Sequence, residues 1–80
     1  MPGTFIVVYI VAFDLDDRIQ AVPAFTPRVA ASEAAAIEEA GELARRHAGV
    51  IVWRRANDPV IGEEGDPEVV FSLGKVGDFA

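Results

Sequence analysis

Eighty residues make one domain, residues 1–80, with one thin hydrophobic core, and they exclude a second domain. The chain has no cysteine, which excludes disulfide bonds, cysteine-based zinc sites and thiol catalysis and leads us to expect a cytoplasmic protein. A formal net charge of −6 argues against direct binding of nucleic acid, which uses lysine and arginine to neutralise phosphates, and favours a basic partner.

The first predicted element is a strand over residues 4–13, whose sequence TFIVVYIVAF is rich in β-branched and aromatic residues. Its apolar run is far too short to cross a membrane, which takes about 20 residues. Both faces of the strand are apolar, and this pattern is typical of a strand that is covered on both sides. One of the two faces carries Phe5, Val7, Tyr9, Val11 and Phe13.

A turn and a returning strand follow. The sequence DLDDR, residues 14–18, predicts a turn, because aspartate side chains bond to nearby backbone amides. Asp14 and Asp16 form a pair similar to the nucleophile motif of haloacid-dehalogenase phosphatases, but 80 residues cannot build the doubly wound sheet of that family. Residues 19–25 are predicted to return as the second strand of a hairpin. Pro23 lacks a backbone donor and places this strand at an edge of the sheet.

A helix is predicted over residues 33–47, after a loop that ends at Ser32, a favourable N-cap residue. Gly49 is expected to stop it. Acidic residues in the first half of the helix and basic residues in its last turn match the helix dipole. The inward face consists mostly of small side chains, which lets the helix lie close to a sheet: Ala36, Ile37, Ala40, Leu43, Ala44, His47 and Ala48.

Two further strands are predicted over residues 49–55 and 68–75. In the first of them Val50 and Val52 share one face, and Ile51 and Trp53 share the other, so both faces are again apolar. The element order is ββαββ. We therefore predict an α+β fold, with a mostly antiparallel four-stranded sheet and one helix packed on one face.

The second face of this sheet has no predicted cover. One helix covers one face only, and 51% of the residues are hydrophobic, which is more than so small a core hides. The simplest cover is a second copy of the chain, so a homodimer is predicted. Its contact face would consist of Phe5, Val7, Tyr9, Ile51 and Trp53.

The sequence offers no set of nucleophile, base and orienting group. His47 is the only histidine, Ser32 serves as a helix cap, and Ser72 lies inside an apolar strand. The acidic segments also lack the ligand spacing of an EF-hand calcium loop. We therefore expect a protein without catalytic residues, metal or cofactor. A small metal-dependent hydrolase that uses the carboxylates is the alternative.

The segment from Asp58 to Glu68 carries five acidic residues and no basic one. It is longer than a hairpin needs, and extra loop length in a small domain is often functional. One interpretation is a solvated connection that protects the sheet from aggregation. The other is a surface that presents negative charge to a phosphate-binding protein, together with acids of the turn and the helix. This predicted partner-binding set is Asp14, Asp16, Asp17, Glu38, Glu39, Glu42, Glu63, Glu64, Asp66 and Glu68.

The string RRHAGVIVWRR, followed by PVIGEEGDPEVVF and GKVGDF, resembles a group of small stand-alone bacterial proteins. In size and charge the chain is also similar to inhibitors carried by phages, including anti-CRISPR proteins, some of which imitate the charge of DNA. This resemblance implies a non-enzymatic inhibitor that occupies the basic, nucleic-acid-binding surface of a partner protein or complex. The alternative function is a housekeeping homodimer or a small-ligand-binding module that uses the apolar sheet face.

Overall fold

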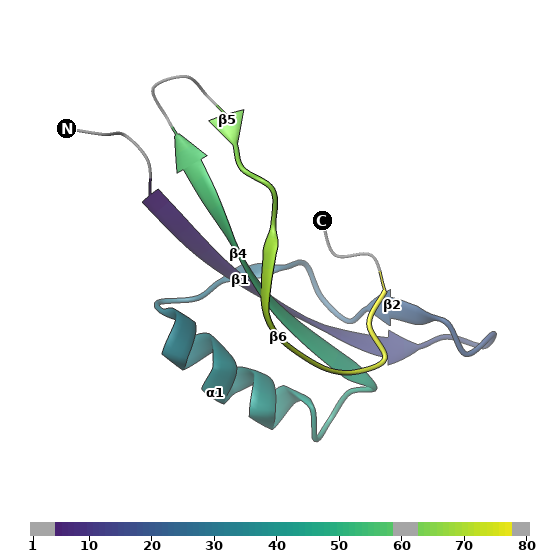
Figure 1. Cartoon of the computed structure of the whole chain (residues 1–80). Helices are drawn as coiled ribbons and strands as arrows, with labels where there is room; N and C mark the ends of the chain where they lie inside the picture. Colours follow the sequence, from purple (N-terminus) through teal and green to yellow (C-terminus); the bar gives the residue numbers. More distant parts are fainter. Residues whose placement is uncertain (1–4, 59–62, 78–80) are drawn as a thin grey trace.

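The structure is a computed structural model that describes residues 5–58 and 63–77. Within them, one helix packs against one face of an antiparallel sheet (Figure 1). This confirms the predicted α+β class with a single helix. In chain order the elements are β1 (Phe5–Leu15), β2 (Ala21–Pro23), β3 (Arg28–Val29), α1 (Glu33–Leu43), β4 (Gly49–Asp58), β5 (Glu63–Glu64) and β6 (Glu68–Gly74).

Two long strands form the centre of the sheet. β1 and β4 pair antiparallel, from Phe5 opposite Asn57 to Phe13 opposite Gly49. β2 and β3 both pair with the other edge of β1, and β5 and β6 both pair with the other edge of β4. The sheet therefore has the four predicted strand positions, but each of the two outer positions is occupied by two shorter strands, β2 with β3 and β5 with β6.

The returning strand is shorter than predicted. The sequence predicts one strand over residues 19–25, whereas β2 ends at Pro23 and a second piece, β3, begins directly after Pro27. Both prolines lack the N–H group that a strand ladder needs, so they interrupt the pairing with β1. The predicted edge position is confirmed, because β2 and β3 pair only with β1 among the strands that the structure describes.

The helix begins as predicted and ends early. Ser32 is its N-cap, and the Oγ atom of Ser32 accepts a hydrogen bond from the Ala35 amide at 3.1 Å. The amides of Arg45 and Arg46 bond to carbonyls three residues back, which tightens the chain into turns after Leu43. The basic residues 45–47 therefore follow the helix instead of forming its last turn. Gly49 does not stop the helix, which has already ended at Leu43, but it is the first residue of β4, as predicted for the strand over residues 49–55.

The helix spans 11 residues, and none in the described chain is long and apolar enough to cross a membrane. A core cluster lies on each face of the sheet, which confirms that both faces are apolar. The cluster on the helix side consists of Val8, Ile10, Val50 and Val52 with Ala36 and Ala40 of the helix. The cluster on the opposite side consists of Val11, Phe13, Ile51 and Trp53.

The chain itself covers part of this opposite side. Ala21 from β2, Phe25 from the loop after it, and Val76 from the segment after β6 pack against the second cluster. The segment after β6 is packed against the domain at Val76, which is half-buried; residues 78–80 lie outside the described part. The covering segments also remove the main reason to expect a bare sheet face.

Candidate functional site

The predicted partner-binding acids fall into three groups, and the first lies at the turn between β1 and β2. The carboxylate of Asp16 organises this turn by accepting hydrogen bonds from the amides of Arg18 and Gln20, both at 2.9 Å. Asp14 Oδ1 lies 2.9 Å from Nδ1 of His47, the residue that joins the end of the helix segment to the sheet. Asp17 is exposed and makes no ion pair with the described bases. Two of the three turn acids therefore have structural partners.

The second group lies on α1. Glu39 forms an ion pair with Arg28 of β3, whose guanidinium carbon also lies 4.6 Å from the ring centroid of Phe25. Glu42 Oε2 is 3.9 Å from Arg45 Nη1, a solvent-exposed pair of the kind that contributes little stability. Glu38 is exposed and has no ion pair within residues 5–58 and 63–77. The helix acids are thus partly neutralised by their neighbours.

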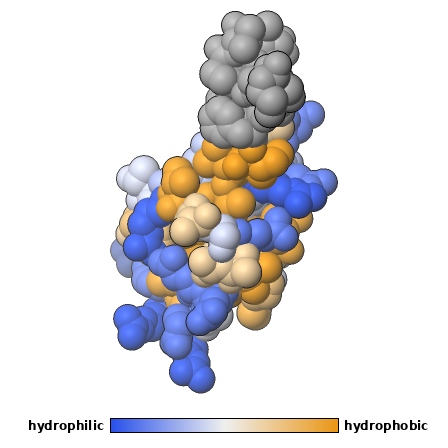
Figure 2. All heavy atoms as spheres, turned by 90° about the vertical axis from the view of Figure 1, so that its left-hand side faces the viewer, coloured by the Kyte–Doolittle hydropathy of each residue, from blue (hydrophilic) through white to orange (hydrophobic). Residues whose placement is uncertain are grey.

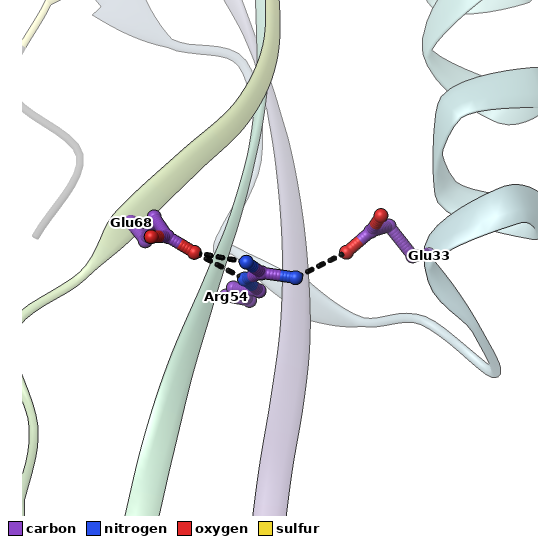
Figure 3. A network of polar contacts seen from close by, with 3 residues as sticks. All are labelled: Glu33, Arg54 and Glu68. Carbon is purple, nitrogen blue, oxygen red and sulfur yellow. Dashed lines mark hydrogen bonds and ion pairs between the residues drawn. The ribbon is translucent and has the colours of Figure 1, made fainter.

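Arg54 connects two acids from different elements (Figure 3). It donates hydrogen bonds to Glu68, the first residue of β6, and its Nη1 lies 3.2 Å from Oε1 of Glu33 in the first turn of the helix. The hydrogen bond and the charge of Glu68 raise the pKa of Arg54 above its ordinary value; burial opposes this effect, and Glu33 adds to it. Arg54 therefore stays protonated, and Glu68 has a structural partner within the sheet while its side chain remains largely exposed.

The third group lies on the hairpin between β4 and β5. We call residues 57–58 and 63–66 the acidic hairpin; residues 59–62 lie outside the described part. Asn57 pairs with Glu64 and Asp58 with Glu63, so this segment, predicted as a loop, begins as a pair of strands. The Gly65 amide closes it by donating to the Ala56 carbonyl at 2.7 Å. The side chains of Glu63 and Glu64 lie outside the described part, whereas Asp66 is exposed.

The structure does not gather these acids into one surface. The turn follows Leu15, the last residue of β1, and the acidic hairpin lies level with Phe5, the first residue (Figure 1). Ten steps along a strand span about 33 Å, several times the screening length of about 8 Å in physiological salt. On one flank hydrophilic and apolar side chains are intermixed (Figure 2). The turn and the hairpin therefore act as separate charged groups.

An open groove of 440 Å³ lies beside the second half of the helix. Two acids and two bases line it, so neither sign of charge dominates, and two of these residues already pair with each other. The lining residues are Arg28, Glu39, Glu42, Leu43 and Arg46. Among the residues with described placement, no group of three or more side chains is arranged to hold a metal ion.

The predicted dimer face is partly inside the monomer. Ile51 and Trp53 are each 3% exposed, so their prediction as surface contact residues is wrong. Tyr9 stacks on Trp53, with ring centroids 5.4 Å apart and an interplanar angle of 18°. Tyr9 and Val7 are half-buried, and the side chain of Phe5 lies outside the described part. Dimer formation remains a prediction, but it needs a different surface.

Sequence reasoning missed the bases that hold the acids. The alternation along β4 places Arg54 on the helix face with Val52, and β6 begins at Glu68, directly opposite. If the predicted strands over residues 49–55 and 68–75 are paired as a hairpin, Arg54 and Glu68 lie close together at its turn end, so the sequence could have indicated this ion pair. No such signal exists for Arg28 and Glu39, because β3 is a two-residue strand between irregular segments. Comparisons of the chain with protein-family models, curated proteins and solved structures find no match.

Proposed function

We propose that this chain is a non-enzymatic binding protein that acts in the cytoplasm as an inhibitor of the anti-CRISPR kind. Its acidic hairpin occupies a basic surface with which a partner protein or complex holds nucleic acid. The observation that carries this proposal is the uneven distribution of bases. From residue 56 to residue 74 the sequence has five acids and no base, and Arg54 forms ion pairs with Glu68 and Glu33.

The hairpin keeps an excess of negative charge. Bases from other elements lie beside Glu39 and Asp14, whereas the hairpin has one neighbouring base in the sequence, Arg55. Against this single base stand four acids: Asp58, Glu63, Glu64 and Asp66. The excess is therefore carried by one short segment that the central strands β1 and β4 anchor at the end of the sheet.

Such a segment suits a surface that evolved to bind phosphates. A nucleic-acid-binding surface presents lysine and arginine side chains along a backbone path. An acid-rich hairpin is attracted to the same potential, which speeds encounter, and once bound it excludes the nucleic acid. Binding of this origin weakens as salt is added, because the charges on both surfaces are exposed and screened.

The proposal is tested with two charge-reversed variants that are matched in net charge. The hairpin variant carries Glu63→Lys, Glu64→Lys and Asp66→Lys, and the control carries Asp17→Lys, Glu38→Lys and Glu42→Lys. Each variant changes the net charge by +6, from −6 to 0. We expect the tagged wild type and the control to capture the same basic protein from a bacterial host lysate, releasable by salt, and the hairpin variant to lose it.

A second measurement separates inhibition from capture. The recovered partner is purified and its affinity for nucleic acid is measured by fluorescence anisotropy while the chain is added. We expect the wild type to displace the nucleic acid and the hairpin variant to leave it bound. Capture that is equal for the hairpin variant and the wild type contradicts the proposal. Equal loss in both variants contradicts the role of the hairpin and indicates recognition by net charge.

A further inference from the structure

The two outer edges of the sheet differ in how they are protected against pairing. One edge consists of the short strands β2 and β3, which Pro23 and Pro27 interrupt. The other edge consists of β5 and β6, and β6 is seven residues long, with neither proline nor lysine inside it. Short strands, prolines and lysines are the usual means of preventing edge-to-edge association. β6 has none of these three, although it carries a β-bulge, which is a further protective device, before Phe71. Within the described chain β6 pairs with β4 alone.

The backbone of β6 turns polar groups outward. The amide of Lys75 donates to the carbonyl of Ala48 at 3.0 Å, and Gly74 lies opposite Gly49. In an antiparallel ladder, successive residues direct their N–H and C=O groups to opposite edges. Leu73 therefore bonds toward β4, and Ser72 directs its amide and carbonyl away from the sheet. A row of outward groups of this kind is a template for another strand.

The side chains along this edge are apolar and only partly covered. Phe71 and Leu73 lie opposite Val52 and Val50, so they belong to the helix face. The helix lies over β1 and β4 (Figure 1), and it leaves Leu73 51% exposed. The extra residue of a β-bulge, Val70, precedes Phe71, and the regular part of the edge runs from there to Leu73, before Gly74 with its φ angle of 75°.

We propose that the outer edge of β6 pairs with β6 of a second copy, antiparallel, so that two chains form one continuous sheet. With Ser72 opposite Ser72 of the second copy, the outward groups of the two strands bond to each other. Phe71 then lies opposite Leu73 of the second copy, and two-fold symmetry repeats this contact. The exposed Leu73 gains an apolar partner in both chains.

The charges at the ends of β6 favour this antiparallel order. Glu68 begins the strand and Lys75 directly follows it. Antiparallel pairing brings Lys75 of each copy to the Glu68 end of the other, whereas parallel pairing brings like charges together. The two acidic hairpins then lie at opposite ends of the dimer. The dimer does not require the proposed inhibitory function, and a failed capture experiment leaves this inference unaffected.

The inference is tested by sedimentation equilibrium of the full chain. We expect the wild type to sediment at twice the monomer mass and Leu73→Lys at the monomer mass, because lysine on the edge blocks strand pairing. The matched control is Val29→Lys on the opposite edge, where Val29 is 67% exposed, and it is expected to stay dimeric. Circular dichroism confirms that each variant is folded. A monomeric wild type, or a folded Leu73→Lys variant that remains dimeric, overturns the proposal.

A cysteine probe tests the register, since the chain has no cysteine of its own. Ser72→Cys places two thiols opposite each other across the two-fold axis, so mild oxidation is expected to yield a disulfide-linked dimer. Leu73→Cys faces Phe71 of the second copy and is expected to cross-link much less. Equal cross-linking at both positions contradicts the proposed pairing. A wild type that is monomeric and binds an extended peptide of another protein at this edge also overturns it.

Discussion

Ile19 adopts a backbone conformation that suits glycine. Its φ angle is 61°, and it is the last of the loop residues 17–19, which the hydrogen bond from the Asp16 amide to the Gln20 carbonyl closes. Three-residue hairpin loops commonly end in a left-handed residue that is usually glycine. A side chain in that conformation costs roughly 1–2 kcal/mol. We predict that Ile19→Gly raises the free energy of unfolding by about 1 kcal/mol, measured by urea denaturation.

The control for this prediction is Ile6→Gly. Ile6 is 58% exposed, close to the 66% of Ile19, but it lies in a regular strand. Glycine there adds flexibility without relieving strain, so Ile6→Gly is expected to destabilise the fold. A loss of stability at both positions would contradict the account of Ile19. The sequence predicts the turn from its aspartates, but isoleucine gives no sign of the left-handed residue and is itself predicted to begin the returning strand.

At the scale of the elements, β4 and the end of β6 approach each other at two glycines. Gly49 lies opposite Gly74, and a Cβ atom on Gly49 would overlap the backbone of Lys75. Gly49→Ala is therefore predicted to lower the free energy of unfolding by about 2 kcal/mol, because the strands must separate. Gly41 in the helix has open space around its Cα atom. Gly41→Ala is predicted to raise stability by about 1 kcal/mol, since alanine favours the helix.

Thermal denaturation of both glycine variants checks this pair of predictions. A Gly49→Ala variant as stable as the wild type would show that the approach of the two strands is loose. The comparison also separates packing from conformation, because both substitutions add the same methyl group. Loss at one position and gain at the other can arise only from the surroundings of each glycine.

Local signals explain which elements the sequence predicts. The apolar runs of β1 and β4 and the Ser32 cap are encoded within each segment, so these elements begin close to their predicted positions. The strand β3 depends on pairing with a distant part of β1, and no local pattern indicates it. The role of Gly49 likewise depends on a segment 25 residues away in sequence, around Gly74. Among the candidate acids, only Glu68 could be matched to its base in this way, because Glu68 and Arg54 lie on neighbouring predicted strands.

At the scale of the whole molecule, the surplus of apolar residues is resolved mainly within the chain. The sequence predicts one face of the sheet to be bare, because the chain has one helix. Instead, β2, the loop after it and the segment after β6 fold over the second cluster. The loop and the segment after β6 are irregular, and periodicity does not reveal which face an irregular segment covers. The exposed large apolar side chains of the described residues are spread over several elements. Two of them, Val69 and Leu73, lie in the edge strand β6, and the others are Ile6, Leu15, Ile19, Val22, Val29 and Ile37.

Because Trp53 is buried, its replacement affects the stability of the whole fold. Replacing a buried tryptophan by alanine costs about 3–5 kcal/mol, and small domains have a total stability of about 5–15 kcal/mol. Trp53→Ala is therefore expected to lower the unfolding midpoint strongly in a urea titration followed by circular dichroism. This contrasts with a surface role, in which the substitution would leave the midpoint unchanged and remove only the binding of a partner.

Tyr9→Phe provides the control, because Tyr9 stacks on Trp53 and phenylalanine keeps the ring. The stacked pair is then retained, and stability is expected to change by less than about 1 kcal/mol. If Trp53→Ala kept the wild-type midpoint while losing capture of the partner, the second face would be a binding surface after all. If Trp53→Ala lost stability and Tyr9→Phe did not, the second face would be part of the hydrophobic core. The edge strand β6 and the acidic hairpin would then be the surfaces left for partners.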